Sequence, residues 1–339
     1  MSIFEQVSII GDGAMGTVLA TLLCEKNVCV RMWGYDAEQL KEIAAAGENV
    51  KFLPGYKLPE DLVFEPEDAR IMNGADLIVS AVPCQFMRGV WGRLKKNVPK
   101  NILNGNVPIV SVAKGIENDT LLRPTQIIAD ILGDGVRCVA LSGPNISDEL
   151  ARKLPAVACV ACQDEELAKK VQYTFNAPWL RVYTNTDIVG VELAGAMKNI
   201  IAIAAGIIDG TGAGNNAKAA LLSRGLAEIT RLGVACGARP ETFAGLTGLG
   251  DLVTTCISPT GRNRSFGERI GKGQTAQEAR NATESVIEGI ATCESVYKGL
   301  GAKYNVEIPI TQAVYEVLFE KKPVQAAIAD LMSRQLKAE

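Results

Sequence analysis

Residues 7–33 read VSIIGDGAMGTVLATLLCEKNVCVRMW, and this stretch decides the class of fold. A short apolar run at 7–10 leads into G-x-G-x-x-G at 11–16, a helical pattern at 17–26 and a second apolar run at 28–33. The order predicts a strand, a tight turn, a helix and a second strand. In a doubly wound sheet this unit binds dinucleotides.

Each glycine of the loop has a separate physical task in that interpretation. Gly11 permits the tight turn, Gly13 lets a pyrophosphate approach the backbone, and Gly16 lets the helix pack closely on the strand. The helix that follows offers free N–H groups and a favourable dipole to an anion. A glycine-rich turn that binds nothing remains the alternative.

Further apolar runs predict a largely parallel sheet. They lie at 77–82, 109–113, 138–142 and 156–161, and helical patterns at 84–95 and 121–132 lie among them. Alternating strands and helices are typical of doubly wound α/β domains, where ligands bind at the carboxyl ends of the strands. The residues at those ends are Pro83, Lys114 and the Gly143-Pro144-Asn145 turn.

The character of the sequence changes near residue 187, beyond which long helical patterns broken by glycine loops dominate. We therefore predict a Rossmann-like dinucleotide-binding domain over residues 1–188. An all-α substrate-binding and catalytic domain is predicted over residues 189–339.

Composition excludes several classes of function. The chain has 339 residues, of which 47% are hydrophobic and 22% charged, with a formal net charge of −3. A balanced charge without long runs argues against nucleic-acid or membrane-surface binding. The N-terminus leads directly into a predicted strand without a signal-peptide pattern, and the apolar stretch 200–208 is too short to span a bilayer. We expect a cytoplasmic protein.

The cysteines and the absence of histidine restrict the chemistry further. Nine cysteines are scattered, and the C-x-x-C at 159–162 is interpreted as part of a buried strand because no second ligand pair accompanies it. The chain has no histidine, which excludes any mechanism that uses a histidine base or a histidine metal ligand. We expect no metal site.

Lys198 is the most unusual residue of the helical part. It lies in ELAGAMKNIIAIAAGII (192–208), and its neighbours at helical spacing are small or apolar. Burying a lysine lowers its pKa toward neutrality, which suits a group that gives and takes a proton. The alternative is a lysine at the edge of the core whose ammonium group reaches solvent.

Eight motifs occur in an order that resembles the NAD(P)-dependent glycerol-3-phosphate dehydrogenase family of bacterial type, over nearly the whole chain. They are GDGAMG (11–16), NVKFLPG (49–55), VP (82–83), AKG (113–115), SGP (142–144), GAMKNIIA (195–202), GLGDL (248–252) and GRNR (261–264). The resemblance implies reversible reduction of dihydroxyacetone phosphate to sn-glycerol 3-phosphate with NAD(P)H. It further implies a role in supplying glycerophospholipid synthesis and, by family habit, a homodimer.

The resemblance also implies a set of site residues. The catalytic residues are Lys198 as general base in the oxidation direction, Asp251, Lys114 and Thr255. The cofactor would contact Gly11, Gly13, Ala14, Met15, Gly16, Gly34, Tyr35, Pro83, Lys114, Ser147, Arg262, Val286 and Glu288. The phosphorylated substrate would contact Lys114, Gly143, Asn145, Lys198, Asp251, Gly261, Arg262 and Asn263.

The residues themselves support parts of this assignment. Asp251 could pair with Lys198 and offset the cost of its burial, or cap the helix that follows, and both can hold together. The planar fork of Arg262 suits a phosphate, although a carboxylate would fit equally and a solvated basic loop is the alternative. Lys114 could equally be an ordinary loop lysine, and Glu288 an ordinary surface charge.

Four residues depart from the family pattern. Asn145 and Ser147 stand in GPNIS where GPSFA is frequent, Asn215 stands where aspartate is frequent, and Gly261 replaces a frequent serine. None of these positions is Lys198 or Asp251, so the expected activity is unaffected.

The choice between NAD and NADP depends on the residues after the second strand. Asp36 lies 20 residues after Gly16, close to the spacing of the acid that binds the ribose in NAD enzymes. No arginine follows the strand, and Arg31 lies within it. We therefore favour NAD slightly, although many bacterial relatives use NADPH.

Two other functions remain open from the residues alone. One is another lysine-dependent dehydrogenase of related architecture that acts on a small carboxylate substrate. The other is a dinucleotide sensor without turnover, for which a buried lysine would serve no purpose.

Overall fold

The computed structural model describes residues 3–283 and 285–336, and it divides into two compact units. The first comprises residues 1–113 and 123–188, and the second comprises residues 114–122 and 189–339. The boundary falls between Ile188 and Val189, and the segment Lys114–Leu122 belongs to the second unit.

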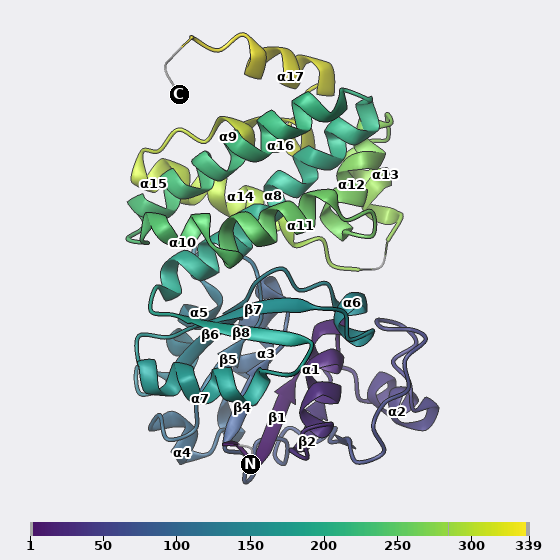
Figure 1. The fold of residues 1–339 in the computed structure, drawn as a ribbon, viewed down its shortest axis with the longest axis vertical. Helices are drawn as coiled ribbons and strands as arrows, with labels where there is room; N and C mark the ends of the chain where they lie inside the picture. The colour runs from purple at the N-terminus through teal and green to yellow at the C-terminus, as the bar shows by residue number, and fades with distance from the viewer. Residues whose placement is uncertain (1–2, 284, 337–339) are drawn as a thin grey trace. The chain divides into compact units, whose positions relative to one another are not determined.

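The first unit is built on an eight-stranded sheet with the order β3-β2-β1-β4-β5-β6-β7-β8 (Figure 1). All neighbouring strands are parallel except β6 and β7. The strands are β1 (Gln6–Ile10), β2 (Cys29–Trp33), β3 (Val63–Phe64), β4 (Leu77–Ser80), β5 (Ile109–Ser111), β6 (Cys138–Ser142), β7 (Ala156–Ala161) and β8 (Leu180–Asn185). The helices are α1 (Ala14–Cys24), α2 (Ala37–Ala46), α3 (Cys84–Leu94), α4 (Lys100–Leu103), α5 (Pro124–Leu132), α6 (Ser147–Ala151) and α7 (Glu165–Phe175), with a 3₁₀ turn η1 (Lys95–Asn97).

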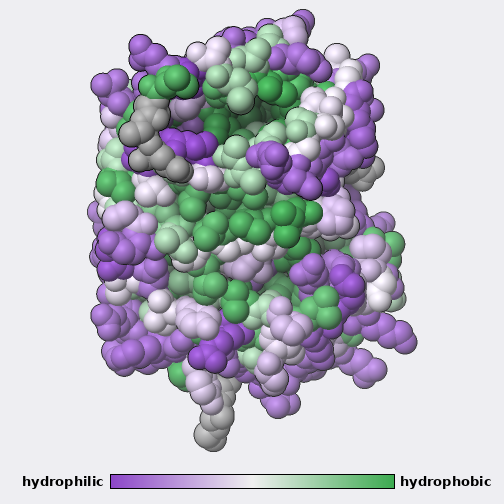
Figure 2. Space-filling model, turned by 45° about the horizontal axis from the view of Figure 1, so that its top comes forward, coloured by the Kyte–Doolittle hydropathy of each residue, from purple (hydrophilic) through white to green (hydrophobic). Residues whose placement is uncertain are grey.

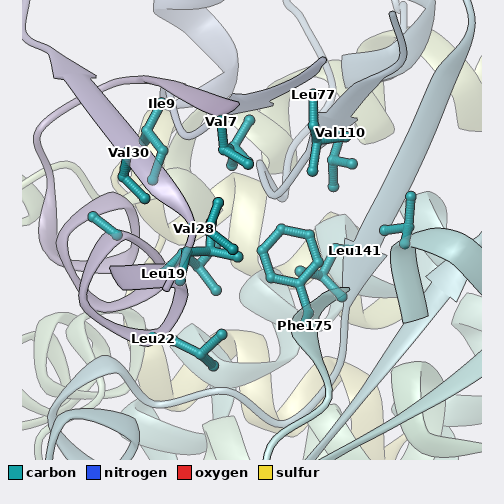
Figure 3. Packing of buried hydrophobic residues seen from close by; sticks show 14 of the residues in the cluster. Val7, Ile9, Leu19, Leu22, Val28, Val30, Leu77, Val110, Leu141 and Phe175 are labelled. Atoms are coloured by element: carbon teal, nitrogen blue, oxygen red, sulfur yellow. The ribbon is translucent and has the colours of Figure 1, made fainter. Parts of the chain in front are cut away.

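The strands bury side chains on both faces, which explains their unbroken apolar runs. Val7 and Ile9 of β1 join a cluster with Leu19 and Leu22 of α1 and with Phe175 of α7 (Figure 3). The indole Nε1 of Trp91 in α3 donates to Ser80 Oγ at 3.1 Å, so the alternate residues of β4 meet α3. Helices therefore cover the sheet on both sides.

The prediction of a largely parallel Rossmann-like sheet followed by an all-α part is confirmed. The sequence patterns missed β3, β8, α2, η1, α4, α6 and α7. Strand β8 has the burial pattern of an edge, with Arg181, Tyr183 and Thr184 exposed, so its apolar run is interrupted. The helical pattern at 121–132 begins only at Pro124, because Asp119 and Leu121 have positive φ angles in the loop before it.

The second unit is helical. Its elements are α8 (Ile188–Thr211), α9 (Gly214–Ala235), α10 (Pro240–Ala244), π-helix η2 (Leu246–Gly250), α11 (Asp251–Ile257), α12 (Arg262–Gly271), α13 (Ala276–Asn281), α14 (Glu288–Glu294), π-helix η3 (Ser295–Gly301), α15 (Ala302–Tyr304), α16 (Pro309–Phe319) and α17 (Val324–Met332). All residues from 190 to 207 of α8 are buried, so this helix is the core of the unit.

Helix α8 is long and apolar enough to cross a membrane by length and composition, but 89% of its apolar window is buried inside the protein. Figure 2 shows hydrophilic residues over much of the visible surface, with hydrophobic residues between them. Large hydrophobic side chains exposed on the second unit, such as Ile257 and Met332, come from other helices. The apolar character of α8 is therefore explained by its burial among neighbouring helices.

Candidate active site

The ammonium group of Lys198 lies inside the helical unit against the carboxylate of Asp251. Lys198 Nζ donates to Asp251 Oδ1 at 2.6 Å, and the two residues are 6% and 1% exposed. The alternative in which the ammonium group of Lys198 reaches solvent is wrong. The predicted pairing with Asp251 is present, and it offsets part of the cost of burying both charges.

Two more of the predicted catalytic residues meet the same carboxylate. Lys114 Nζ donates to Asp251 Oδ2 at 2.6 Å, so the aspartate bridges two lysines. Lys198 also donates to Thr255 Oγ1, which lies one helical turn beyond Asp251 on α11. Lys114 is the more accessible lysine, with a side chain that is 19% exposed against 7% for Lys198.

The environment of Lys198 brings the pKa of its ammonium group closer to neutrality. Burial, opposed by the negative charge of Asp251 and assisted by the positive charge of Lys114, lowers the pKa of Lys198 to about 8. A lysine near neutrality can hold or release its proton at physiological pH, which general acid–base catalysis requires.

The backbone before Asp251 explains how its side chain reaches both lysines. The glycine-rich stretch forms η2, a π-helix that runs directly into α11, so Asp251 is the first residue of α11 and Gly250 occupies the cap position. The alternative in which Asp251 caps this helix is therefore wrong. A Cβ at Gly248 would lie 2.0 Å from the carbonyl oxygen of Phe243, so this path requires glycine.

The two arginines of GRNR have different surroundings. Arg264 is held by Asp209, with Nε to Oδ2 at 2.7 Å, and by Glu268. Arg262 is exposed, and its guanidinium makes no hydrogen bond or ion pair among residues 3–283 and 285–336. It is also the first residue of α12, where backbone N–H groups are available to an anion. Arg262 is thus the arginine that is available to a phosphate.

A chain of side-chain amides connects this loop with the catalytic helix. Asn263 Nδ2 donates to Asn199 Oδ1 at 3.0 Å, and Asn263 Oδ1 accepts from the N–H of Gly289 at 3.0 Å. Asn263 follows Arg262 and Asn199 follows Lys198, so the loop of Arg262 adjoins the segment of Lys198. Sequence reasoning assigned no role to Asn199, although it lies in the motif of Lys198.

Three other predicted site residues of the helical unit lie at the beginnings of helices α12 and α14. Glu288 is the first residue of α14 and directly precedes Gly289, and Val286 lies two residues before Glu288. Gly261 is the N-cap position of α12. Asn215, which departs from the family pattern, is exposed in the first turn of α9.

In the first unit, the glycine loop has the geometry that a dinucleotide needs. A Cβ at Gly11, where φ is +117°, would lie 2.7 Å from the carbonyl oxygen of Ala81, and one at Gly16 would lie 2.2 Å from that of Gly11. At Gly13 nothing lies within 4 Å, so the space beside the backbone is open to a ligand. Gly13 precedes α1, so the residues present fit a pyrophosphate at the N-terminus of this helix.

Ala14 and Met15, the other two predicted cofactor contacts in this loop, form the first turn of α1, and both are partly buried.

At the end of β2, an arginine that the sequence did not indicate lies beside Tyr35. The guanidinium of Arg93, from α3, is 5.1 Å from the Trp33 ring centre and 5.2 Å from that of Tyr35. It also binds Asp68, with Nε to Oδ2 at 2.7 Å and Nη2 to Oδ1 at 2.8 Å. Gly34 lies between the two aromatic residues, and the charge of Arg93 is neutralised by Asp68.

Asp36 has a structural task that its spacing did not reveal. Its Oδ1 accepts from the N–H of Glu38 at 3.0 Å and of Gln39 at 3.4 Å, so it is the N-cap of α2. Arg31, which lies within β2, donates to the carbonyl oxygen of Asn73.

The SGPN turn at the end of β6 has a tight backbone. Gly143 has a φ of +132°, and Asn145 Nδ2 donates to the carbonyl oxygen of Val157 at 2.9 Å. Ser147 is the first residue of α6, and Pro83 occupies the cap position of α3. The amide nitrogen of Asn145 is thus engaged with β7, which leaves its oxygen as the better candidate for a ligand contact.

All nine cysteines are free thiols, and Cys159 is buried within β7 whereas Cys162 is buried directly after it, which agrees with the strand interpretation for Cys159. Burial raises the pKa of Cys159 to about 11, so its thiol is protonated and unreactive at neutral pH. Among the described residues, no three of the His, Cys, Asp and Glu side chains are grouped in a way that could hold a metal ion.

A doubly wound sheet with an open glycine loop, together with a helical unit that buries a lysine of lowered pKa, is the arrangement of a dinucleotide-dependent dehydrogenase. Two family models match successive parts of the chain. The N-terminal model of NAD-dependent glycerol-3-phosphate dehydrogenase matches residues 6–168 and the C-terminal model matches residues 187–329. The chain belongs to the NAD-dependent glycerol-3-phosphate dehydrogenase family.

Similar proteins cover the whole length of the chain. Glycerol-3-phosphate dehydrogenase [NAD(P)+] of Geobacter sulfurreducens is 45% identical over 337 residues, which is 99% of both chains. The protein of the same name from Corynebacterium glutamicum is 45% identical over 98% of this chain and 99% of its own. The crystal structure of glycerol-3-phosphate dehydrogenase from Coxiella burnetii has a TM-score of 0.92 at 36% identity and covers 97% of this chain and 99% of that one.

Proposed function

We propose that this protein catalyses the reversible NAD(P)H-dependent reduction of dihydroxyacetone phosphate to sn-glycerol 3-phosphate. The observation that carries the proposal is the buried Lys198–Asp251 pair adjoining the loop of Arg262, whose guanidinium has no partner in the part of the chain that the structure describes. The named relatives support the same substrate.

Lys198 is proposed to act as the general acid in reduction and as the general base in oxidation. The nicotinamide dinucleotide, when bound, supplies or accepts the hydride at C2 of the substrate. In the direction of reduction, the ammonium group of Lys198 donates its proton to the oxygen on C2 as negative charge develops there. In the direction of oxidation, the neutral amine removes the proton of the C2 hydroxyl group.

Asp251 and Lys114 prepare that exchange. The carboxylate of Asp251 fixes the direction of the Lys198 amine through one oxygen and binds Lys114 through the other. Lys114, the more accessible of the two lysines, is proposed to hold the substrate oxygen and to stabilise its developing negative charge. Thr255 accepts from Lys198 and restricts its orientation further.

The phosphate of the substrate is assigned to Arg262 and the first turn of α12. A guanidinium presents two parallel N–H groups to a phosphate, and the helix terminus adds backbone donors and a favourable dipole. A small carboxylate could occupy the same groups, so the substrate class must be tested directly.

The decisive test is a comparison of ketone substrates at a fixed concentration of NADH, followed by loss of the absorbance of the reduced nicotinamide. Dihydroxyacetone phosphate is compared with dihydroxyacetone, pyruvate and 2-dehydropantoate. We expect turnover with the phosphorylated ketone alone at micromolar to millimolar concentration. Turnover with a carboxylate and not with the phosphate would establish the alternative dehydrogenase, and tight NADH binding without turnover of any of them would establish a sensor.

The cellular setting is part of the proposal. The product, sn-glycerol 3-phosphate, would supply glycerophospholipid synthesis from the cytoplasm, and family habit supports a homodimer. Light scattering coupled to size-exclusion chromatography gives the mass of the particle in solution. A value near that of one 36.1 kDa chain would contradict the homodimer.

A further inference from the structure

Asp12, the second residue of the glycine loop, places a carboxylate at the end of β2. A Cβ built on Gly34, the residue after β2, would lie 2.6 Å from Asp12 Oδ2 and 2.8 Å from its Cγ. The side chain of Asp12 therefore rests directly on the backbone of Gly34. In a dinucleotide-binding sheet, the end of the second strand is where the adenosine ribose is received.

The carboxylate of Asp12 is held in this place from α2. Gln39 Nε2 donates to Asp12 Oδ2 at 2.9 Å, and Lys51 Nζ donates to Gln39 Oε1 at 3.0 Å. The main chain is held as well, because Asn49 Nδ2 donates to the carbonyl oxygen of Asp12 at 2.7 Å and to Thr17 Oγ1 at 2.8 Å. Asn49 is 0% exposed, so this support is rigid.

The charges around Asp12 come from three elements. Burial raises the pKa of Asp12 and the neighbouring Asp36 raises it further, whereas the hydrogen bond from Gln39 and the charge of Lys51 lower it. Arg93, the guanidinium beside Tyr35, is already bound by Asp68. Lys51 is thus a cation that could attract an anionic group at this place, whereas Asp12 would repel it.

The residue that sequence spacing assigned to the ribose is engaged elsewhere. Asp36 uses Oδ1 to cap α2, and Asp36 and Asp12 lie on opposite sides of Gly34–Tyr35 in the chain. Asp12, which lies 22 positions before Gly34 in the sequence, supplies the carboxylate that contacts Gly34 instead.

We propose that Asp12 accepts the hydroxyl groups of the adenosine ribose and disfavours the 2′-phosphate of NADP(H), so that the glycine loop itself selects NAD(H). A carboxylate accepts hydrogen bonds from the 2′- and 3′-hydroxyls of the ribose. It repels a phosphate at the 2′ position, where the low dielectric at a partly buried site strengthens the repulsion. The inference rests on the proposed function only for the class of cofactor.

The test measures binding without substrate. Isothermal titration calorimetry gives the dissociation constants of NADH, NADPH, 5′-AMP and adenosine 2′,5′-bisphosphate. Each is measured for the wild type and for the Asp12→Asn and Asp36→Asn variants. Both variants remove one negative charge within the same region, so Asp36→Asn is the matched control. We expect Asp12→Asn to improve binding of NADPH and of the bisphosphate about tenfold relative to NADH and AMP, about 1.4 kcal/mol. Asp36→Asn should leave both ratios unchanged.

Two further measurements test the role of Asp12 if the Asp12→Asn variant is poorly folded. The first is Asp12→Ala, for which the same shift in ratios is expected. The second uses the wild type alone, where AMP should bind more tightly than the bisphosphate and the difference should shrink as salt screens the carboxylate. Tighter binding of the bisphosphate by the wild type would show that Lys51 governs the site and would overturn the inference, as would a shift in Asp36→Asn without one in Asp12→Asn.

Failure of the proposed function is distinguishable from failure of this inference. A protein that shows the expected binding ratios but does not turn over dihydroxyacetone phosphate would refute the function and leave Asp12 as the selector. A protein that turns over the ketone while its binding ratios are unaffected by both substitutions of Asp12 would refute the inference alone.

Discussion

Lys198 and Asp251 lie 53 residues apart in the sequence, and their side chains meet at 2.6 Å inside the helical unit. The pair is buried, yet Asp251 does not restore the ordinary pKa of Lys198, because burial lowers that pKa to about 8 despite the neighbouring carboxylate. The balance of these two effects supports the proposed acid–base chemistry.

Replacing Lys198 with alanine tests that chemistry directly. We expect turnover to fall by roughly two to four powers of ten, the usual range for a general acid–base group, while folding and cofactor binding remain nearly intact. Steady-state kinetics, circular dichroism and NADH titration are measured together. The control is Lys298→Ala, which removes an exposed lysine of the same unit. Near-normal turnover by the Lys198→Ala variant would contradict the assignment.

The pH profile follows from the same pKa. In the direction of reduction the protonated lysine is required, so kcat/KM should fall as pH rises through about 8. In the direction of oxidation the neutral amine is required, so kcat/KM should rise through the same value. Asp251 raises the pKa of Lys198, so Asp251→Asn should move both inflections to lower pH. Inflections that stay at the same pH in that variant would assign the proton to another group.

Arg262 and Arg264 form a matched pair for testing phosphate recognition. Arg262→Ala should raise the KM for dihydroxyacetone phosphate more than it lowers kcat, since the phosphate charge is present in the ground state and the transition state alike. Activity on unphosphorylated dihydroxyacetone, a poor substrate, should change little. Arg264→Ala removes one of the two cationic partners of Asp209, the other being Lys218, and should lower the melting temperature instead. A loss of activity on both ketones in Arg262→Ala would indicate a structural role.

Cofactor preference in turnover is a separate prediction. We expect kcat/KM for NADH to be at least as high as for NADPH at fixed dihydroxyacetone phosphate. The guanidinium near the end of β2 is neutralised by Asp68, and Asp12 presents a negative charge there. A preference of tenfold or more for NADPH, about 1.4 kcal/mol, would contradict this expectation.

Local patterns determined much of the protein before any tertiary contact was known. The run of residues 7–33 alone indicates β1, the glycine loop, α1 and β2, because periodicity and glycine chemistry are properties of neighbouring residues. The unusual position of Lys198 is also visible in the sequence, since a lone charge on an apolar helical face is costly wherever the helix packs.

Only the tertiary structure decided which groups act together. Spacing selected Asp36 for the ribose, but the chain turns at Gly34 so that Asp12 contacts the end of β2 and Asp36 caps α2. The sequence showed two arginines in GRNR, and only the tertiary structure pairs Arg264 with Asp209 and Glu268 while Arg262 has no partner among the described residues. Such pairings form between side chains from distant parts of the chain, and the local periodicity of the sequence does not determine which of these side chains meet.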